Sequence, residues 1–202
     1  MFDSQWEHQK HMNKIILSFF DYSGNWPKYY REAGYEVYSL DIKNGFDILE
    51  LDVYNDIIPL GKIHGILAAP PCTDFAGSGA QYWKQKDLDG RTDASLKLID
   101  KVLEIIEVCQ PCWWALENPV GRLQKLRPQL GKPWYFNPCD FGDPYTKKTG
   151  LWGNFNKDLA KTPVKPDPNN WIMKLGGKSE RTKELRSMTP LGFAKAFFLA
   201  NP

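Results

Sequence analysis

Short runs of apolar residues, separated by polar turns, recur along most of the chain. Each run is shorter than a typical helix and is mostly apolar, β-branched or aromatic, which is the pattern of a strand buried on both faces. The predicted strands cover residues 14–20, 36–40, 65–69, 113–116 and 150–153. A further short segment, centred on residues 47–49, lies between the second and third strands.

Apolar residues at helical spacing predict helices between these strands. The first helix is expected over residues 26–33, with a proline in its first turn. A longer helix is expected to begin at Thr92 as its N-cap, because apolar residues recur every three or four positions from Leu96 to Ile106. The last helix is expected over residues 189–200.

Two stretches carry no periodic apolar pattern and predict loops. Residues 73–90 contain three glycines, and residues 158–178 are rich in Pro, Asn and Lys. Strands that alternate with helices predict an α/β protein with a mostly parallel sheet and helices on both of its faces. Ligands of such proteins bind at the carboxyl ends of the strands.

Size and composition agree with a single domain that spans residues 1–202. Of the residues, 42% are hydrophobic and 25% are charged, as in ordinary globular proteins. No apolar run approaches the about 20 residues that a membrane-spanning helix needs. Residues 1–13 are polar and lack the apolar centre of a secretory signal, so a cytoplasmic protein with no membrane partner is expected. The oligomeric state is not indicated by the sequence.

The four cysteines are not spaced like a disulfide framework, which suits a reducing compartment. Cys109 and Cys112 form a C-x-x-C pair, for which a redox or metal role is an alternative. The pair follows a helical pattern instead of opening one, and no second pair completes a zinc site. No metal is therefore expected.

Charge is distributed unevenly between the two parts of the chain. Residues 1–121 contain 11 Lys and Arg against 18 Asp and Glu, a net charge of −7, whereas residues 122–202 contain 15 against 6, a net charge of +9. Such segregation predicts that the C-terminal part meets a polyanion such as DNA. The alternative is a solvated, lysine-rich surface.

Two tripeptides at the ends of predicted strands carry the strongest chemical signal. Pro70-Pro71-Cys72 follows the strand at 65–69, and Glu117-Asn118-Pro119 follows the strand at 113–116. A thiol and a carboxylic acid from neighbouring strand ends can attack a ring and protonate it. The alternative is a buried cysteine on a proline-stiffened turn and a glutamate that caps a nearby element.

The first two strands predict a site for a nucleotide-type cofactor. The first strand leads into a turn with Gly24, and Asp41 closes the second strand, where a carboxylate can accept ribose hydroxyls. Asp47 is placed to touch an adenine. A single glycine argues against a dinucleotide; ordinary turn chemistry at Gly24 and a surface role for Asp41 are the alternatives.

Taken together, these segments resemble the DNA cytosine-5 methyltransferases over most of the chain. The resemblance rests on six segments in the family's order: Phe19–Gly24, Asp41, Pro70–Cys72, Glu117–Pro119, Gly142–Thr149 and Thr189–Ala196. It implies a Rossmann-like fold that binds S-adenosylmethionine and methylates carbon 5 of cytosine in DNA. Phage and restriction-modification systems are the implied setting, and the last segment is implied to pack beside the cofactor.

The resemblance also implies roles for individual residues. Cys72 is the implied nucleophile at carbon 6 of a cytosine flipped out of the duplex, Glu117 the proton donor to ring nitrogen 3, and Asn118 the brace of the cysteine loop. After methyl transfer, loss of the carbon 5 proton to an unidentified base frees the cysteine. The implied cofactor contacts are Phe20, Asp21, Ser23, Gly24, Asp41, Ile42, Asp47, Ile48 and Pro70.

The sequence departs from the family in its basic segment. The family's Arg-x-Arg is replaced by Lys147-Lys148-Thr149, which keeps one charge and removes a guanidinium. Arg122, just after the Glu-Asn-Pro segment, is expected to take over its contact with the base. Residues 73–90 are expected to be the flexible loop that closes over that base.

A second departure is the lack of a sizeable target-recognition domain. Only a basic insert at about residues 154–187 occupies its place, and its cations include Lys157, Lys161, Lys165, Lys174, Lys178, Arg181 and Arg186. Such residues hold phosphates without reading sequence, so weak or very short sequence preference is expected. Alternatives are a solvated loop without a DNA role, a transferase for RNA, free nucleotides or another group, and an inactive nucleic-acid-binding protein.

Overall fold

The computed structural model describes residues 14–169, 172 and 179–202. The expectations for residues 1–13, for Lys174 and Lys178, and for part of the predicted loop at 158–178 lie outside this set. Residues 158–169 contain neither helix nor strand, as predicted for them.

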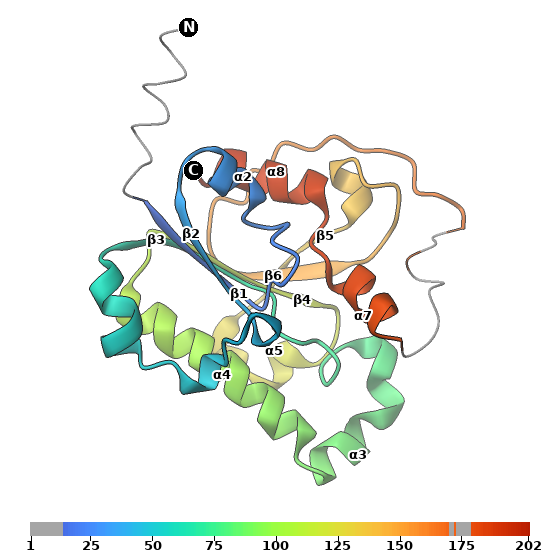
Figure 1. Ribbon diagram of the computed structural model, residues 1–202. Helices are drawn as coiled ribbons and strands as arrows, with labels where there is room; N and C mark the ends of the chain where they lie inside the picture. Colours follow the sequence, from blue (N-terminus) through green and yellow to red (C-terminus); the bar gives the residue numbers. More distant parts are fainter. Residues whose placement is uncertain (1–13, 170–171, 173–178) are drawn as a thin grey trace, which may run out of the picture.

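A six-stranded sheet forms the centre of the molecule (Figure 1). Its strands lie in the order β2-β1-β3-β4-β6-β5. Neighbours among β1 to β4 are parallel, whereas β6 runs antiparallel to β4 and β5 antiparallel to β6. The mostly parallel sheet predicted from the sequence is confirmed. The strands are β1 Ile15–Phe19, β2 Glu36–Leu40, β3 Ile63–Ala68, β4 Trp113–Pro119, β5 Trp134–Phe136 and β6 Thr149–Asn154.

Helices cover both faces of the sheet, with α2 and α8 on one face and α4 and α5 on the other (Figure 1). The α-helices are α2 Lys28–Glu32, α3 Trp83–Leu88, α4 Arg91–Cys109, α5 Leu123–Leu126, α7 Glu180–Ser187 and α8 Leu191–Ala200. Short 3-10 helices span Ile42–Asn44, Ile48–Glu50, Ile58–Leu60, Gly77–Tyr82, Pro128–Leu130 and Pro138–Phe141, and a π-helical turn spans Val53–Ile57. No helix in the described ranges is long and apolar enough to cross a membrane.

Each face of the sheet has its own hydrophobic core. On the α4 face, the side chains of Ile99, Val102 and Ile105 are fully buried and share one core with the buried side chains that β1 and β3 direct toward this helix. On the other face, aromatic rings dominate: Trp26 packs against Phe197 of α8 with ring centroids 5.7 Å apart. These two cores hold the four parallel strands rigidly, so the groups at their carboxyl ends are held in fixed positions.

The expected loop at residues 73–90 is instead largely helical. It forms the 3-10 turn Gly77–Tyr82 and then α3. Gly90, at a φ of +80°, turns the chain directly from α3 into α4, so α4 begins at Arg91. Thr92 is therefore not the N-cap; its hydroxyl donates to Asp87 at 2.6 Å. The glycines were read as signs of flexibility, but they serve tight connections between short helices.

Other predictions differ only at element boundaries. The first helix begins at Lys28 and the last at Leu191, and the predicted strand at 150–153 extends over the whole of β6. The segment centred on 47–49 is a 3-10 turn capped by Asp47. Strand β5 and helix α7 were not predicted, because neither carries a clear apolar period.

Candidate active site

Cys72 and Glu117 come from adjacent strands. In the parallel pair β3 and β4, Ala68 lies opposite Leu116, so the two strands end at the same edge of the sheet. Cys72 follows β3 by four residues, and Glu117 lies within the last residues of β4. The structure thus brings together the thiol and the acid that the sequence analysis singled out.

The Cys72 thiol is partly buried in a tight turn. The backbone carbonyl oxygen of Cys72 accepts hydrogen bonds from the N–H groups of Phe75 and Ala76, at 3.0 and 2.8 Å. Burial raises the pKa of Cys72, and the Glu117 carboxyl adds to that rise, whereas the Lys147 ammonium opposes it. The thiolate therefore depends on Lys147 for charge stabilisation.

Glu117 lies in an environment that favours its protonated form. Its side chain is only 16% exposed, and burial raises its pKa, while the nearby Lys147 ammonium works in the opposite direction. The two groups are 4.0 Å apart, between Lys147 Nζ and Glu117 Oε1. A carboxyl group that keeps its proton to higher pH can act as a general acid.

Residues 147–149, which lead into β6, direct their three side chains to different partners. Lys147 lies beside Glu117, and its ammonium also donates to the carbonyl oxygen of Arg186 at 2.8 Å. Lys148 stacks over the Tyr135 ring at 4.8 Å, and the buried Thr149 hydroxyl donates to the carbonyl of Lys147 at 2.8 Å. Only one cation of this segment therefore faces the acid.

Asn118 connects the end of β4 to the cysteine segment. Its side chain is fully buried, and its Nδ2 donates to the carbonyl oxygen of the buried Pro70 at 3.1 Å. The amide oxygen Oδ1 has no hydrogen-bond partner in the described part of the chain. The donated bond holds the start of the Pro-Pro-Cys turn against β4, which is the position expected for a brace.

The structure corrects the role expected for Arg122. Its guanidinium is buried, donates to the Asp74 carbonyl at 3.0 Å and to Thr92 Oγ1 at 2.7 Å, and pairs with Asp87 at 2.8 Å. It also stacks on the Trp83 ring at 4.8 Å. Through these contacts the guanidinium supports the segment that follows Cys72. The Arg122 guanidinium therefore does not lie beside Cys72 and Glu117.

A buried ion pair completes this support. Lys86 Nζ lies 3.1 Å from Asp74 Oδ1 and donates to the Thr73 carbonyl at 2.5 Å, while Ser95 Oγ donates to Asp74 Oδ2 at 2.6 Å. Both side chains of the pair are largely buried, with Lys86 only 7% exposed. The segment that follows Cys72 is thus fastened to α3 and α4 and is not a free loop.

The turn after β1 is built around a buried carboxylate. Phe20 adopts a φ of +60°, which reverses the chain, and Asp21 Oδ1 accepts Ser23 Oγ at 2.7 Å and the Gly24 N–H at 2.9 Å. Asp21 Oδ2 accepts the Trp26 N–H at 3.3 Å. Asp21 therefore shapes the predicted cofactor turn, and Gly24, at a φ of +67°, provides the left-handed position that this turn needs.

Asp41 and Asp47 each stand immediately before a single turn of 3-10 helix, and their carboxylates are arranged in the same way. One oxygen of each caps a short helix, through the N–H of Lys43 for Asp41 and of Leu49 for Asp47, both at 2.9 Å. Within the described ranges, Oδ2 of each carboxylate makes no hydrogen bond to the protein, so it can accept a hydrogen bond from a hydroxyl or amino group of a ligand. The pair suits the polar edges of an adenosine.

Apolar side chains near these carboxylates are unusually exposed. Tyr22, Ile42 and Phe46 expose 53%, 67% and 46% of their surfaces. Such side chains can cover the faces of an adenine ring. Ile48, by contrast, is 5% exposed and packs in the core beneath α4, so its side chain is not part of this surface.

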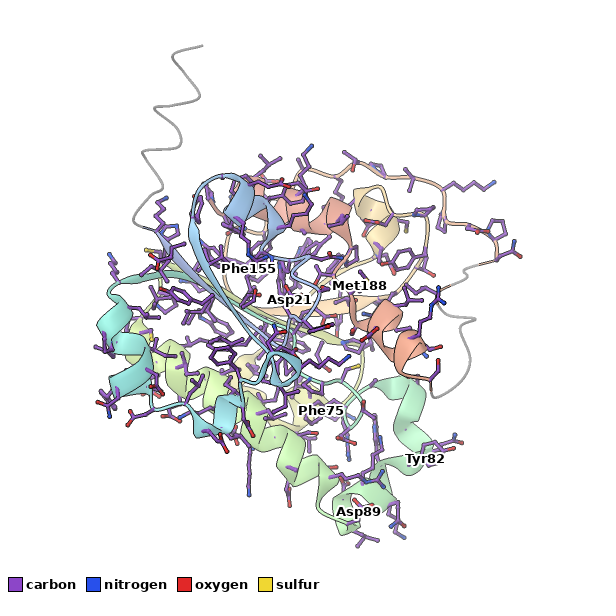
Figure 2. All side chains as sticks on the ribbon, in the orientation of Figure 1. Asp21, Phe75, Tyr82, Asp89, Phe155 and Met188 are labelled. Carbon is purple, nitrogen blue, oxygen red and sulfur yellow. The ribbon has the colours of Figure 1, made fainter. Side chains whose placement is uncertain are left out.

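Helix α7 lies across the edge of the sheet and contacts both halves of the site. Glu184 pairs with Lys43 at 2.7 Å, next to Asp41, and Arg186 accepts the hydrogen bond from Lys147. After α7 ends, the Thr189 carbonyl oxygen accepts a hydrogen bond from Asn25 Nδ2 at 3.1 Å. This bond joins the segment between α7 and α8 to the turn that holds Asp21. Asp21 and Met188 are both labelled in Figure 2, near this junction.

A small pocket lies where these elements meet. It is lined by Glu117, Phe136, Lys147, Thr149, Ser187, Met188, Thr189, Pro190 and Phe193. Ser187 and Met188 were missed as site residues because their side chains carry no recognisable chemical pattern, whereas Thr189 and Pro190 begin the segment that the resemblance implied to pack beside the cofactor. Their place depends on the tertiary contacts of α7 and α8 with the sheet.

Cys109 and Cys112 lie away from this site, at the end of α4 and before β4. Both are free thiols, and Cys112 is exposed. Within the described residues, no three His, Cys, Asp or Glu side chains are grouped so as to hold a metal ion.

No protein-family profile matches the sequence, and no curated protein matches it. Among solved structures, the chain is similar to the Entamoeba histolytica methyltransferase EhMeth, with a TM-score of 0.50 and 14% identity over 76% of this chain. A prophage-encoded protein of E. coli, assigned as a DNA modification methyltransferase, matches over 83% of this chain with 19% identity and a TM-score of 0.46. This chain spans 57% and 56% of the lengths of those two proteins.

The sheet order and the likeness to EhMeth define the class of fold. The protein has a mixed α/β, Rossmann-like fold of the methyltransferase type, with helices on both faces of a mostly parallel sheet. This confirms the fold class predicted from the sequence. At these identities the likeness concerns the fold alone.

Replacing Glu117 with glutamine is expected to change how stability depends on pH. Below the ordinary carboxyl pKa, Glu117 is protonated in both folded and unfolded protein. As the pH rises toward the raised pKa of the folded state, the unfolded carboxyl ionises first, and the wild-type protein loses stability, by about 1.4 kcal/mol per unit of pKa difference. Glu117→Gln lacks this loss.

Urea unfolding between pH 4 and pH 8 measures the effect. Glu117→Gln should gain stability relative to the wild type as the pH rises, with the smallest gain at pH 4. Glu104→Gln, at an exposed position of α4, controls for the substitution. A constant difference between Glu117→Gln and wild type across the range would contradict the burial of an ionisable group at this position.

Proposed function

We propose that the protein transfers a methyl group from S-adenosylmethionine to carbon 5 of cytosine in DNA. The observation that carries this proposal is the meeting of Cys72, Glu117 and Lys147 at the carboxyl edge of the sheet, beside the turn built on Asp21. The likeness to methyltransferase structures supports the fold that the proposal needs, and the chemistry rests on the side chains.

The Cys72 thiolate adds to carbon 6 of the pyrimidine, and the new C–S bond pushes an electron pair toward carbon 5 and ring nitrogen 3. Glu117 donates its proton to nitrogen 3 and so prevents negative charge from accumulating there. General acid catalysis by a positioned side chain raises the reaction rate by ~10²–10⁴-fold. Lys147 stabilises the thiolate before attack and the Glu117 carboxylate after proton transfer.

Carbon 5, now electron-rich, accepts the methyl group. Loss of the carbon 5 proton to a base then returns the electron pair to the ring, and expulsion of the thiolate frees Cys72. The proton on nitrogen 3 returns to Glu117, so both side chains regain their starting state. Asn118 keeps the Cys72 turn at a constant distance from β4 throughout this sequence.

The cofactor, when bound, would supply an activated methyl group on a sulfonium and would leave as a neutral thioether that keeps the electron pair of the broken S–C bond. Asp41 and Asp47 would hold its ribose and adenine through their outer oxygens, and Ile42 and Phe46 would cover the ring faces. The turn at residues 20–24 would hold its amino-acid end through backbone groups, since Asp21 is occupied within the turn.

DNA is the substrate that the charge distribution favours. The side chains of Lys157, Lys161, Lys165 and Arg181 are exposed and come from the segment after β6. Such cations hold phosphates without reading bases, so we expect binding that weakens steeply with salt and depends little on sequence. A base within a duplex must leave the stack before Cys72 can reach it.

The decisive test is transfer of a labelled methyl group. The protein is incubated with labelled S-adenosylmethionine and, separately, with double-stranded DNA, single-stranded DNA, RNA and dCMP. DNA in which every cytosine is replaced by thymine is the matched control. Label on cytosine of DNA supports the proposal. Label on RNA or dCMP alone would assign another substrate, and DNA binding without transfer would assign an inactive binding protein.

A further inference from the structure

The pocket beside Glu117 contains one side-chain cation from the basic segment, Lys147. That ammonium is already shared between the Glu117 carboxyl and the carbonyl oxygen of Arg186. Lys148 lies over Tyr135, and Arg122 is used beneath the cysteine turn. A nucleotide that enters the pocket brings a phosphate, and none of these three cations is available for it.

Helix α7 places a fourth cation at this point. The last turn of α7 is held over the pocket by the hydrogen bond from Lys147 to the Arg186 carbonyl, and its earlier turn by the ion pair between Lys43 and Glu184. The next residues, 187–190, line the pocket together with Glu117 and Lys147. The backbone at residue 186 is therefore fixed at the entrance to the site.

The Arg186 side chain is partly exposed, and its guanidinium makes no hydrogen bond or ion pair with the described residues. Its positive charge lowers the pKa of Cys72, against the effect of burial, and its backbone is held beside Lys147 by the hydrogen bond to its carbonyl oxygen. The exposed Arg181 lies one and a half turns earlier on the same helix and has no such effect on Cys72. Arg186 is thus the arginine of α7 whose backbone lies at the site.

We propose that Arg186 binds a phosphate of the target nucleotide while its base lies between Cys72 and Glu117. This inference rests on the proposed function. A base inserted into the pocket leaves its sugar and phosphates at the entrance, where the last turn of α7 lies. The planar, always charged guanidinium suits bidentate contact with phosphate oxygens. The short segment that follows β6 would then contribute directly to substrate binding.

The proposal is tested by binding, which does not require turnover. Fluorescence anisotropy measures the affinity of wild-type protein, Arg186→Ala and Arg186→Lys for a short single-stranded oligonucleotide with one cytosine. Arg181→Ala, which removes another phosphate-binding cation of the same helix, is measured for comparison and should weaken binding less than Arg186→Ala. A second pair of oligonucleotides carries a neutral methylphosphonate at the linkage on either side of that cytosine. The Arg186 variants keep the bond from Lys147, because it is accepted by the backbone carbonyl.

Arg186→Ala should weaken binding by about 10- to 100-fold, as expected for a lost charge-assisted contact, and Arg186→Lys should restore part of it. One of the methylphosphonates should weaken binding to wild type and to Arg181→Ala but add nothing in Arg186→Ala. Equal losses in Arg186→Ala and Arg181→Ala, an unchanged methylphosphonate penalty in Arg186→Ala, or no binding by the wild type would each overturn the proposal. Methyl transfer, measured on the same samples, reports separately on the proposed function.

Discussion

Cys72→Ser should lose methyl transfer by ~10⁴-fold or more, on the scale seen when other covalent enzymes lose their nucleophile. A serine hydroxyl stays protonated where a thiol beside Lys147 can ionise, so the addition to carbon 6 would not take place. DNA with 5-fluorocytosine at the target should form a stable covalent complex with the wild type, because fluorine at carbon 5 cannot leave as a proton does. The adduct is measured on denaturing gels and by mass spectrometry.

Cys112→Ser is the matched control, since Cys112 is an exposed free thiol outside the site. It should keep both methyl transfer and the covalent complex. Thermal unfolding of Cys72→Ser should remain close to that of the wild type, because the partly buried side chain is replaced by one of similar size. Full transfer by Cys72→Ser would remove the covalent mechanism, even if the protein methylates DNA.

Lys86→Met should reduce the free energy of unfolding by about 3–5 kcal/mol, because it leaves the largely buried Asp74 carboxylate without its ammonium partner. Adding Asp74→Asn to Lys86→Met should recover part of this loss, since the second change removes the unpaired charge. Urea unfolding of the wild type, both single variants and the double variant gives the coupling between the two side chains.

Lys28→Met provides the control for loss of an ion pair at the surface. Lys28 pairs with Glu32 on α2, and both side chains are well exposed, so this variant should show no measurable change in stability. If Lys86→Met were as stable as the wild type, or if the double variant were less stable than Lys86→Met, the ion pair would not hold the cysteine segment.

The hydrophobic pattern predicted the sheet because strands buried on both faces are continuous apolar runs. The same pattern predicted Cys72 and Glu117 at the ends of neighbouring strands. In the structure β3 and β4 are parallel neighbours, and the two residues lie at the ends of these strands. Chain order along an alternating α/β sequence is enough for this step, since parallel strands present their carboxyl ends on one side of the sheet.

Charged residues were harder to place than apolar ones. Arg122 is only three residues beyond Pro119, yet its long side chain turns under the sheet edge to Asp87 and Thr92. Arg186 is 69 positions beyond Glu117 in the sequence but lies at the site, because α7 crosses the edge of the sheet. A long, flexible cation can reach several partners, and sequence distance does not decide among them.

The sequence alone determined the α/β class, the edge of the sheet where chemistry is expected, and the thiol and acid delivered to it. These follow from local periodicity and from the geometry of parallel strands. Only the tertiary structure decided which cations serve that edge and which segments are fixed, because both depend on contacts between elements far apart in the chain. The buried partners of Asp74 and the position of α7 over Lys147 belong to this second kind.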